Sequence, residues 1–211
     1  MSDSQGLPPE FFDAVYEGVP PWEIGRPQAD IVRLFERGGF KGKVLDVGCG
    51  TGDNSLFLAG KGLDVLGIDR VAKAVERAIA KAKQAGLTVA FRVADALQLD
   101  KLGQVFDTVL DCGLFHTLSD KDRLCYAKGL RAVVKNRGTL HILCFSDQEP
   151  PGIGPRRIAE RELIELFNMR GWLVEEVAEA RFESNDHPDG ARAWLATFIR
   201  CADSFSPHHP T

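Results

Sequence analysis

The chain has no long apolar run, no excess of positive charge and no paired-cysteine motif. No apolar stretch approaches the roughly 18 residues of a membrane-spanning helix, and the N terminus shows no basic region followed by an apolar run. We therefore expect a cytoplasmic protein with no membrane partner. The net charge is −4 and the isoelectric point is about 5.8, so no overall positive field is present to attract a nucleic-acid partner.

Patterns typical of disulfides and metal sites are also missing. The five cysteines are scattered without a C-x-x-C pair, which favours buried free thiols in a reducing compartment. His208 and His209, near the C terminus, are most simply surface residues, and no set of aspartate and asparagine ligands can be assembled from the order of residues. We therefore expect no metal ion.

The composition that is present predicts one globular domain with short appendages. A chain of 211 residues with 44% hydrophobic content can bury a substantial core. We predict four segments: a disordered N terminus at 1–10, an N-terminal segment with short helices at 11–40, the main domain at 41–202 and a flexible tail at 203–211.

Apolar strand patterns and helical repeats alternate five times in the main domain. This alternation predicts an α/β fold with a doubly wound parallel sheet that is covered by helices on both faces. The predicted strands are 43–47, 63–68, 87–93, 105–110 and 139–145. The predicted helices are 29–37, 53–60, 71–85 with Val75, Ala78, Ile79 and Ala82 buried, one that starts at Ser119 with Leu124, Ala127, Leu130 and Val134 buried, and 159–170.

The pattern changes at the C-terminal end. Two long apolar strands, 172–182 and 191–201, are separated only by a predicted loop at 183–190. That loop is too short for a crossover helix, so the two strands are predicted to form an antiparallel hairpin at the sheet edge. The complete sheet would then have seven strands, most of them parallel.

A glycine-rich loop follows the first predicted strand. The segment 43–52 reads KVLDVGCGTG, and the glycines let the backbone turn tightly and lie close to a ligand. The next strand ends in Asp69, which is placed to accept hydrogen bonds from two ribose hydroxyls. The spacing G-x-G-x-G argues against a nicotinamide dinucleotide, as does Asp46, because its carboxylate would repel a pyrophosphate and attract an ammonium group.

These residues, together with Ala94-Asp95-Ala96, resemble the glycine motif and acidic positions of the class I S-adenosylmethionine-dependent methyltransferases. The resemblance covers the chain from Phe11 to Arg200, including the C-terminal hairpin. It implies a Rossmann-like fold, S-adenosylmethionine as cofactor and S-adenosylhomocysteine as product.

The resemblance implies a cofactor contact at each matching position of the loop and the second strand. Gly48 and Gly50 would let the backbone approach the cofactor, and Asp46 would face its methionyl end. Asp69 would hold the ribose, and its neighbour Arg70 is counted with the cofactor-binding residues.

Two later segments match as well. Asp95 would accept a hydrogen bond from the adenine amino group and the Ala96 N–H would meet a ring nitrogen, although Asp95 taken alone is as readily a helix N-cap. The segment from Asp111 to Leu114 corresponds to the turn that, in this family, lies beside the sulfonium and the transferring methyl.

Residues 18–27 resemble the tryptophan-containing lid motif of the thiopurine and halide/thiol methyltransferase-like branch and of the related heterocyclic-toxin and benzoquinone methyltransferases. The resemblance implies that 11–40 is a lid and that the Trp22 indole lies near the sulfonium, where a cation–π contact is favourable. The alternative is that Trp22 pins the N-terminal segment to the core. Arg26 would pair with the cofactor carboxylate or hold the lid shut, and otherwise is a solvated surface charge.

Methyl transfer from a sulfonium is an in-line displacement, so alignment in a dry pocket is the main task. A phenol or heterocyclic hydroxyl would benefit from a base, and His116 is the best-placed candidate, with a buried hydrogen-bonding histidine as the alternative. Asp111 is a second catalytic candidate that would steer the acceptor or the cofactor amine. Arg156 and Arg157 either line an acceptor pocket for an anionic substrate or are plain surface charges.

The first hypothesis is a methyltransferase acting on a small-molecule thiol, phenol or heterocycle, with a role in detoxification. The alternatives are a methyltransferase acting on a macromolecule and a non-catalytic cofactor-binding regulator. The N/D-P-P-Y motif of amino-methylating enzymes is absent, because Asp111-Cys112-Gly113-Leu114 holds that place. The sequence does not predict the oligomeric state.

Overall fold

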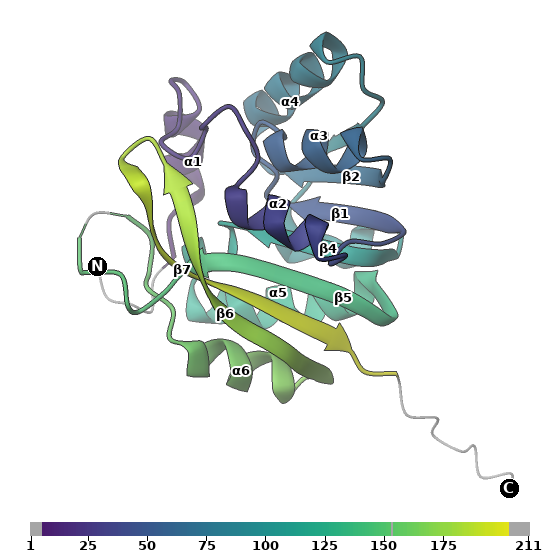
Figure 1. The fold of residues 1–211 in the computed structure, drawn as a ribbon, viewed down its shortest axis with the longest axis vertical. Coiled ribbons are helices and arrows are strands. Elements are labelled where there is room, and N and C mark those ends of the chain that lie inside the picture. Colours follow the sequence, from purple (N-terminus) through teal and green to yellow (C-terminus); the bar gives the residue numbers. More distant parts are fainter. Residues whose placement is uncertain (1–5, 153, 203–211) are drawn as a thin grey trace, which may run out of the picture.

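The computed structural model describes residues 6–152 and 154–202, and its strands form one seven-stranded sheet (Figure 1). The strand order is β3-β2-β1-β4-β5-β7-β6, with parallel pairing from β3 to β5 and antiparallel pairing of β7 with β5 and β6. The predicted mostly parallel sheet with a C-terminal hairpin is thus confirmed. The strands are β1 Lys43–Val47, β2 Asp64–Asp69, β3 Ala90–Val93, β4 Phe106–Cys112, β5 Val134–Phe145, β6 Trp172–Ser184 and β7 His187–Arg200.

Helices cover both faces of the sheet (Figure 1). One hydrophobic cluster joins the sheet to α2 and α3, with α4 beside α3, and the other joins it to η1, α5 and α6. Because side chains of a buried parallel strand point to both faces, the two clusters share β1, β4 and β5. The helices are α1 Pro9–Val15, α2 Ala29–Glu36, α3 Asp53–Gly60, α4 Ala72–Gln84, η1 Ala96–Leu102, η2 Phe115–Thr117, α5 Asp120–Val133 and α6 Glu160–Asn168.

Two predicted buried side chains are exposed. Ile79 on α4 is 50% exposed and Leu124 on α5 is 49% exposed, so both predictions are wrong. In each helix the buried face is rotated by about one residue from the predicted face. Apolar residues border the buried face on both sides, so the sequence periodicity alone did not distinguish the two orientations. The predicted start of α5 is confirmed, since the Ser119 hydroxyl accepts a hydrogen bond from the Asp122 N–H at 3.1 Å.

The hairpin turn is shorter than predicted. β6 continues to Ser184, which pairs with His187, so the predicted loop at 183–190 is wrong. Residues 185 and 186 form the turn, and the N-terminal segment contacts it: the Asn185 N–H donates to the Pro21 carbonyl at 2.7 Å. β6 is the edge strand, and β7 lies between β5 and β6.

The N-terminal boundary also differs. The predicted disorder of 1–10 is wrong for residues 6–10, because the Leu7 N–H donates to the Thr117 carbonyl at 2.8 Å and α1 begins at Pro9, a residue favoured in the first turn of a helix. Residues 1–5 and the predicted tail at 203–211, with His208 and His209, lie outside the described residues.

The cysteines of the described chain are free, but they are not uniformly buried. Cys144 is buried, whereas Cys125 and Cys201 are exposed, so the expectation of buried thiols is wrong for these two. Within residues 6–152 and 154–202, no helix has the length and apolarity needed to cross a membrane, and no three His, Cys, Asp or Glu side chains converge on a possible metal position.

Candidate functional site

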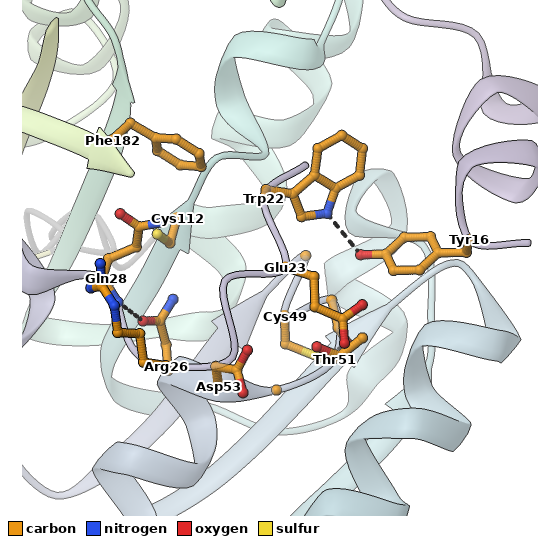
Figure 2. Close-up of a pocket in the computed structure, with 14 residues that line it drawn as sticks. Tyr16, Trp22, Glu23, Arg26, Gln28, Cys49, Thr51, Asp53, Cys112 and Phe182 are labelled. Carbon is orange, nitrogen blue, oxygen red and sulfur yellow. Dashed lines mark hydrogen bonds between the residues drawn. The ribbon is translucent and has the colours of Figure 1, made fainter. Parts of the chain in front are cut away.

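A cavity lies at the C-terminal edge of the parallel strands (Figure 2). β1 is flanked by β2 on one side and β4 on the other, and ligands of doubly wound folds bind where the strand order reverses in this way. The walls are the loop 48–54, the N-terminal residues Tyr16, Trp22, Glu23, Arg26 and Gln28, and Cys112 and Phe182 from the end of β4 and from β6.

The glycine loop forms the floor of this cavity. Gly48, Gly50 and Gly52 have φ angles of 70°, 56° and 85°, in the left-handed region that favours glycine. A Cβ atom on Gly50 would lie 2.9 Å from the Tyr16 hydroxyl. The loop is held in place by Asp69, whose carboxylate accepts a hydrogen bond from the Gly50 N–H at 3.0 Å. The predicted bare loop beside Asp69 is therefore present, with its backbone open to the cavity.

Three buried carboxylates surround the ends of β1, β2 and β4. Asp46 is 1% exposed and accepts a hydrogen bond from the Ser55 hydroxyl at 2.6 Å. The pKa of Asp46 is raised to about 7, mainly by burial and also by the neighbouring Asp111 and Asp69, against the lowering effect of the Ser55 hydrogen bond. Burial also raises the pKa of Asp69. A neighbouring cation would favour the ionised forms of these desolvated carboxylates, and the ammonium contact expected at Asp46 stays a prediction.

The carboxylate of Asp111 accepts hydrogen bonds from the turn after β4 and from α5. One of its oxygens accepts from the Leu114 and Phe115 N–H groups at 3.0 and 3.1 Å, and the other accepts from the Tyr126 hydroxyl at 2.8 Å. Burial raises the pKa of Asp111 to about 6, although these bonds lower it. Both oxygens hold the turn after β4 against α5, so Asp111 has a structural role here, and its contacts with the acceptor or the cofactor stay predictions.

His116 is bonded in a way that contradicts a general base. Its Nδ1 accepts a hydrogen bond from the Phe145 N–H at 3.0 Å, so the neutral ring carries its proton on Nε2. Burial, together with Arg123 and Arg157, lowers the pKa of His116 to about 3. A base needs a free lone pair, and this ring has none to offer. The alternative of a buried hydrogen-bonding histidine is what the structure shows.

Asp95, Ala96 and Arg70 lie outside the cavity lining, as do the buried carboxylates of Asp46, Asp69 and Asp111. Asp95 caps η1, accepting from the Leu97 N–H at 2.8 Å, which is the helix-cap alternative. Ala96 begins η1 and is half-buried, and Arg70 is exposed just after β2. The three stand at the ends of β2 and β3, and their adenosine contacts stay predictions.

The N-terminal segment closes the cavity from above. The Trp22 indole N–H donates to the Tyr16 hydroxyl at 3.1 Å, and both side chains border the cavity (Figure 2). The Arg26 guanidinium donates to both oxygens of Glu183 on β6, at 2.7 and 3.0 Å. Arg26 thus holds the segment against the hairpin, which matches the second of its two predicted roles. We refer to residues 11–30 as the lid.

The lid is attached on two sides. On the hairpin side, the Gln28 side-chain amide donates to the Glu183 carbonyl and accepts from the Glu183 N–H, both at 2.8 Å, as a neighbouring strand would. On the helix side, Glu23 lies 3.4 Å from Arg77 and 3.3 Å from Lys81 of α4. The cavity measures about 60 Å³, far below the roughly 300–1,000 Å³ of a ligand pocket, so in this conformation it is too small for a nucleoside.

Several of these residues were not identified from the sequence. Tyr16, Gln28, Phe182 and Glu183 carry no motif of their own, and the partners of Glu183 lie more than 150 residues away in the chain. The two arginines after the 146–155 loop do not line the cavity: Arg156 pairs with Glu162 at 2.7 Å, and the Arg157 guanidinium donates to the Pro150 and Pro155 carbonyls.

The chain is similar in sequence to known methyltransferases. A family model described as a methyltransferase domain matches residues 44–138. The chain is 33% identical over 202 residues, 90% of this chain and 88% of the relative, to 2-heptyl-1-hydroxyquinolin-4(1H)-one methyltransferase of Mycobacteroides abscessus. It is 28% identical over 147 residues, 69% of this chain and 65% of the relative, to "Probable thiol methyltransferase 2" of Arabidopsis thaliana.

Two solved structures are similar across nearly the whole chain. One comes from work on the conversion of a disulfide bond into a thioacetal group during echinomycin biosynthesis. Its TM-score is 0.83 at 36% identity, and the match covers 92% of this chain and 94% of that one. The other is 1,6-didemethyltoxoflavin-N1-methyltransferase of Burkholderia thailandensis with bound S-adenosylhomocysteine. Its TM-score is 0.72 at 21% identity, covering 92% of this chain and 87% of that one, which establishes likeness of fold.

Proposed function

Because the chain belongs to the class I S-adenosylmethionine-dependent methyltransferases, we propose that it methylates a small molecule bearing a thiol, a phenol or a heterocyclic group. The observation that carries the proposal is the bare glycine loop enclosed between buried carboxylates and an aromatic lid. The names of the relatives support it, since they include a hydroxyquinolinone methyltransferase and a thiol methyltransferase. A role in detoxification is part of the same proposal.

The residues around the cavity fit S-adenosylmethionine, the cofactor of this family. The cofactor supplies an electrophilic methyl group on a sulfonium that is already a good leaving group. Gly48 and Gly50 present backbone without side chains, and we assign Asp46 to the ammonium group. Each oxygen of Asp69 accepts one backbone hydrogen bond and keeps a further lone pair for a ribose hydroxyl.

The chain's own contribution is alignment and exclusion of water. Trp22 and Tyr16 cover the loop, and the lid contacts keep them there. His116 has no free lone pair to accept a proton, and Asp111 does not line the cavity; among the described residues of the wall, Asp53 is paired with Lys81 at 2.9 Å and Glu23 with the same lysine. These contacts favour an acceptor that ionises near neutral pH without help, such as a thiol or an acidic heterocyclic hydroxyl.

The test is turnover of labelled S-adenosylmethionine with a panel of hydroxyquinolones, hydroxyquinones and aromatic thiols, with products identified by mass spectrometry. We expect a methylated product from at least one class. Cofactor binding without turnover across the panel would refute the proposal and favour the non-catalytic alternative.

A matched pair of variants tests the cofactor cradle. Gly50→Ala and Gly86→Ala introduce a side chain at similar positive φ angles, 56° and 65°, but only at Gly50 would the Cβ meet another group, the Tyr16 hydroxyl. We expect Gly50→Ala to lose S-adenosylmethionine binding in calorimetry and Gly86→Ala to retain it. Equal losses would mean that backbone strain, and not the cradle, is being measured.

A further inference from the structure

Phe182 forms the part of the cavity wall beside the end of β4. It is 7% exposed and stands near the end of β6, beside Cys112 of β4 and away from Thr51 and Asp53 (Figure 2). Trp22 contributes to the same hydrophobic cluster from the lid. A ligand that fills the cavity beyond the glycine loop therefore meets an aromatic side chain.

The ring of Phe182 lies directly on the backbone at the end of β4. Gly113 has a φ angle of 90°, and a Cβ there would lie 2.8 and 2.9 Å from two ring carbons of Phe182. The absence of a side chain at Gly113 thus creates the space that the ring occupies. The family resemblance implies that this turn lies beside the transferring methyl group, and the ring of Phe182 would then border the reacting atoms.

Other aromatic rings hold Phe182 from behind. The ring centroids of Phe145 and His116 lie 5.5 and 5.6 Å from that of Phe182, with interplanar angles of 62° and 65°. Such edge-to-face contacts fix the orientation of a ring. Neither Phe145 nor His116 lines the cavity. Phe182 is thus a preorganised aromatic surface on the cavity wall.

We propose that Phe182 is a specificity-determining residue that selects flat aromatic methyl acceptors over aliphatic ones. A planar ring gains contact with the aromatic face or edge of Phe182, whereas a small aliphatic thiol does not. The inference rests on the proposed function for the identity of the site. It goes further by naming the residue that discriminates between classes of acceptor.

The experiment compares Phe182→Leu with Phe145→Leu. Both changes remove one ring from the same aromatic cluster and keep an apolar side chain, but only Phe182 lines the cavity. The probes are a 1-hydroxyquinolin-4(1H)-one and 2-mercaptoethanol. Binding of the quinolone to the complex with S-adenosylhomocysteine is followed by calorimetry, and kcat/KM is determined for both acceptors. Circular dichroism and S-adenosylmethionine affinity report whether each variant is folded and loaded.

We expect Phe182→Leu to weaken quinolone binding about threefold to tenfold and to lower kcat/KM for the quinolone by a larger factor than kcat/KM for the thiol. Phe145→Leu should leave the ratio between the two acceptors unchanged. Equal changes of that ratio in both variants, or an equal loss for both acceptors in Phe182→Leu, would overturn the inference.

The outcomes also separate this inference from the proposed function. Wild-type protein that methylates thiols but does not bind the quinolone overturns the role of Phe182 and leaves the methyltransferase activity standing. Wild-type protein that binds the quinolone through Phe182 without turning over any acceptor supports the inference and refutes the proposed activity.

Discussion

Lowering the pH from 7 to 5.5 is expected to weaken S-adenosylmethionine binding, because Asp46 must be ionised to meet the ammonium group of the cofactor. Burial, more than any other cause, raises the pKa of Asp46 from 3.8 to about 7. The neutral form therefore dominates below pH 7 in the protein without ligand. A bound cation reverses that preference, so binding below pH 7 releases a proton.

The size of the effect follows from the ionised fraction. With a pKa of about 7, Asp46 is about half ionised at pH 7 and roughly 3% ionised at pH 5.5, so affinity should fall about fifteenfold. The α-amino group of the cofactor, with an ordinary pKa near 8, stays protonated over this range. Stability of the unliganded protein should change in the opposite direction. Since the folded pKa lies above 3.8, the contribution of Asp46 to stability is present below that pH and is lost as the pH rises through about 7.

Calorimetry in two buffers of different ionisation enthalpy measures both the affinity and the proton released. The matched variant Asp46→Asn should bind weakly at every pH and lose the pH dependence between 5.5 and 7. Wild-type affinity that is flat over this range would refute the reasoning. A slope that persists in Asp46→Asn would assign the titration to another group, such as Asp69, whose pKa burial also raises.

Three further changes test the cradle, the lid and the turn after β4. Asp69→Ala should lower S-adenosylmethionine affinity at least tenfold, about 1.4 kcal/mol, in the same calorimetric assay, and unchanged affinity would contradict the ribose assignment. Glu183→Gln removes the ion pair with Arg26 and should speed S-adenosylhomocysteine release about twofold to fivefold in stopped-flow fluorescence, as for a partly exposed pair; an unchanged rate would show that this pair does not hold the lid. Tyr126→Phe leaves a buried oxygen of Asp111 without its donor and should lower the free energy of urea unfolding by about 1–3 kcal/mol, whereas a loss below about 0.5 kcal/mol would mean that the bond is not important.

The strands and helices that carry local signals were predictable from the sequence. The bounds of α3 match the prediction because a glycine before it and a glycine at its end delimit the apolar pattern. Ser119 marks the start of α5 because its hydroxyl satisfies a free N–H of the first turn. The glycine loop and Asp69 were likewise found, since close approach of backbone to a ligand requires residues without side chains at fixed spacing.

What the sequence could not predict depends on partners that are distant in the chain. His116 was a candidate base from the sequence, but in the structure the N–H of Phe145, 29 residues later, donates a hydrogen bond to its Nδ1. Asp111 was predicted to steer the acceptor or the cofactor amine, and the sequence did not indicate its hydrogen bonds to the turn amides and Tyr126. Glu183 lies in a segment predicted as a loop, but its backbone pairs with Gln28 of the lid. The local sequence indicates which functional group a residue carries, whereas the tertiary contacts determine whether that group is free to bind a ligand or accept a proton.

The lid's attachment to β6 has a consequence for the behaviour of the protein in solution. Gln28 and Asp30 occupy the outward-facing N–H groups of Glu183 and Arg181 on an edge strand. When the lid swings away to admit a ligand, this edge becomes a row of unpaired strand groups, which is a template for edge-to-edge association between molecules. We expect concentrated ligand-free protein to scatter more light than protein saturated with S-adenosylhomocysteine, and equal scattering would show that the edge stays covered. The residues that close the lid would then also protect the protein from aggregation between turnovers.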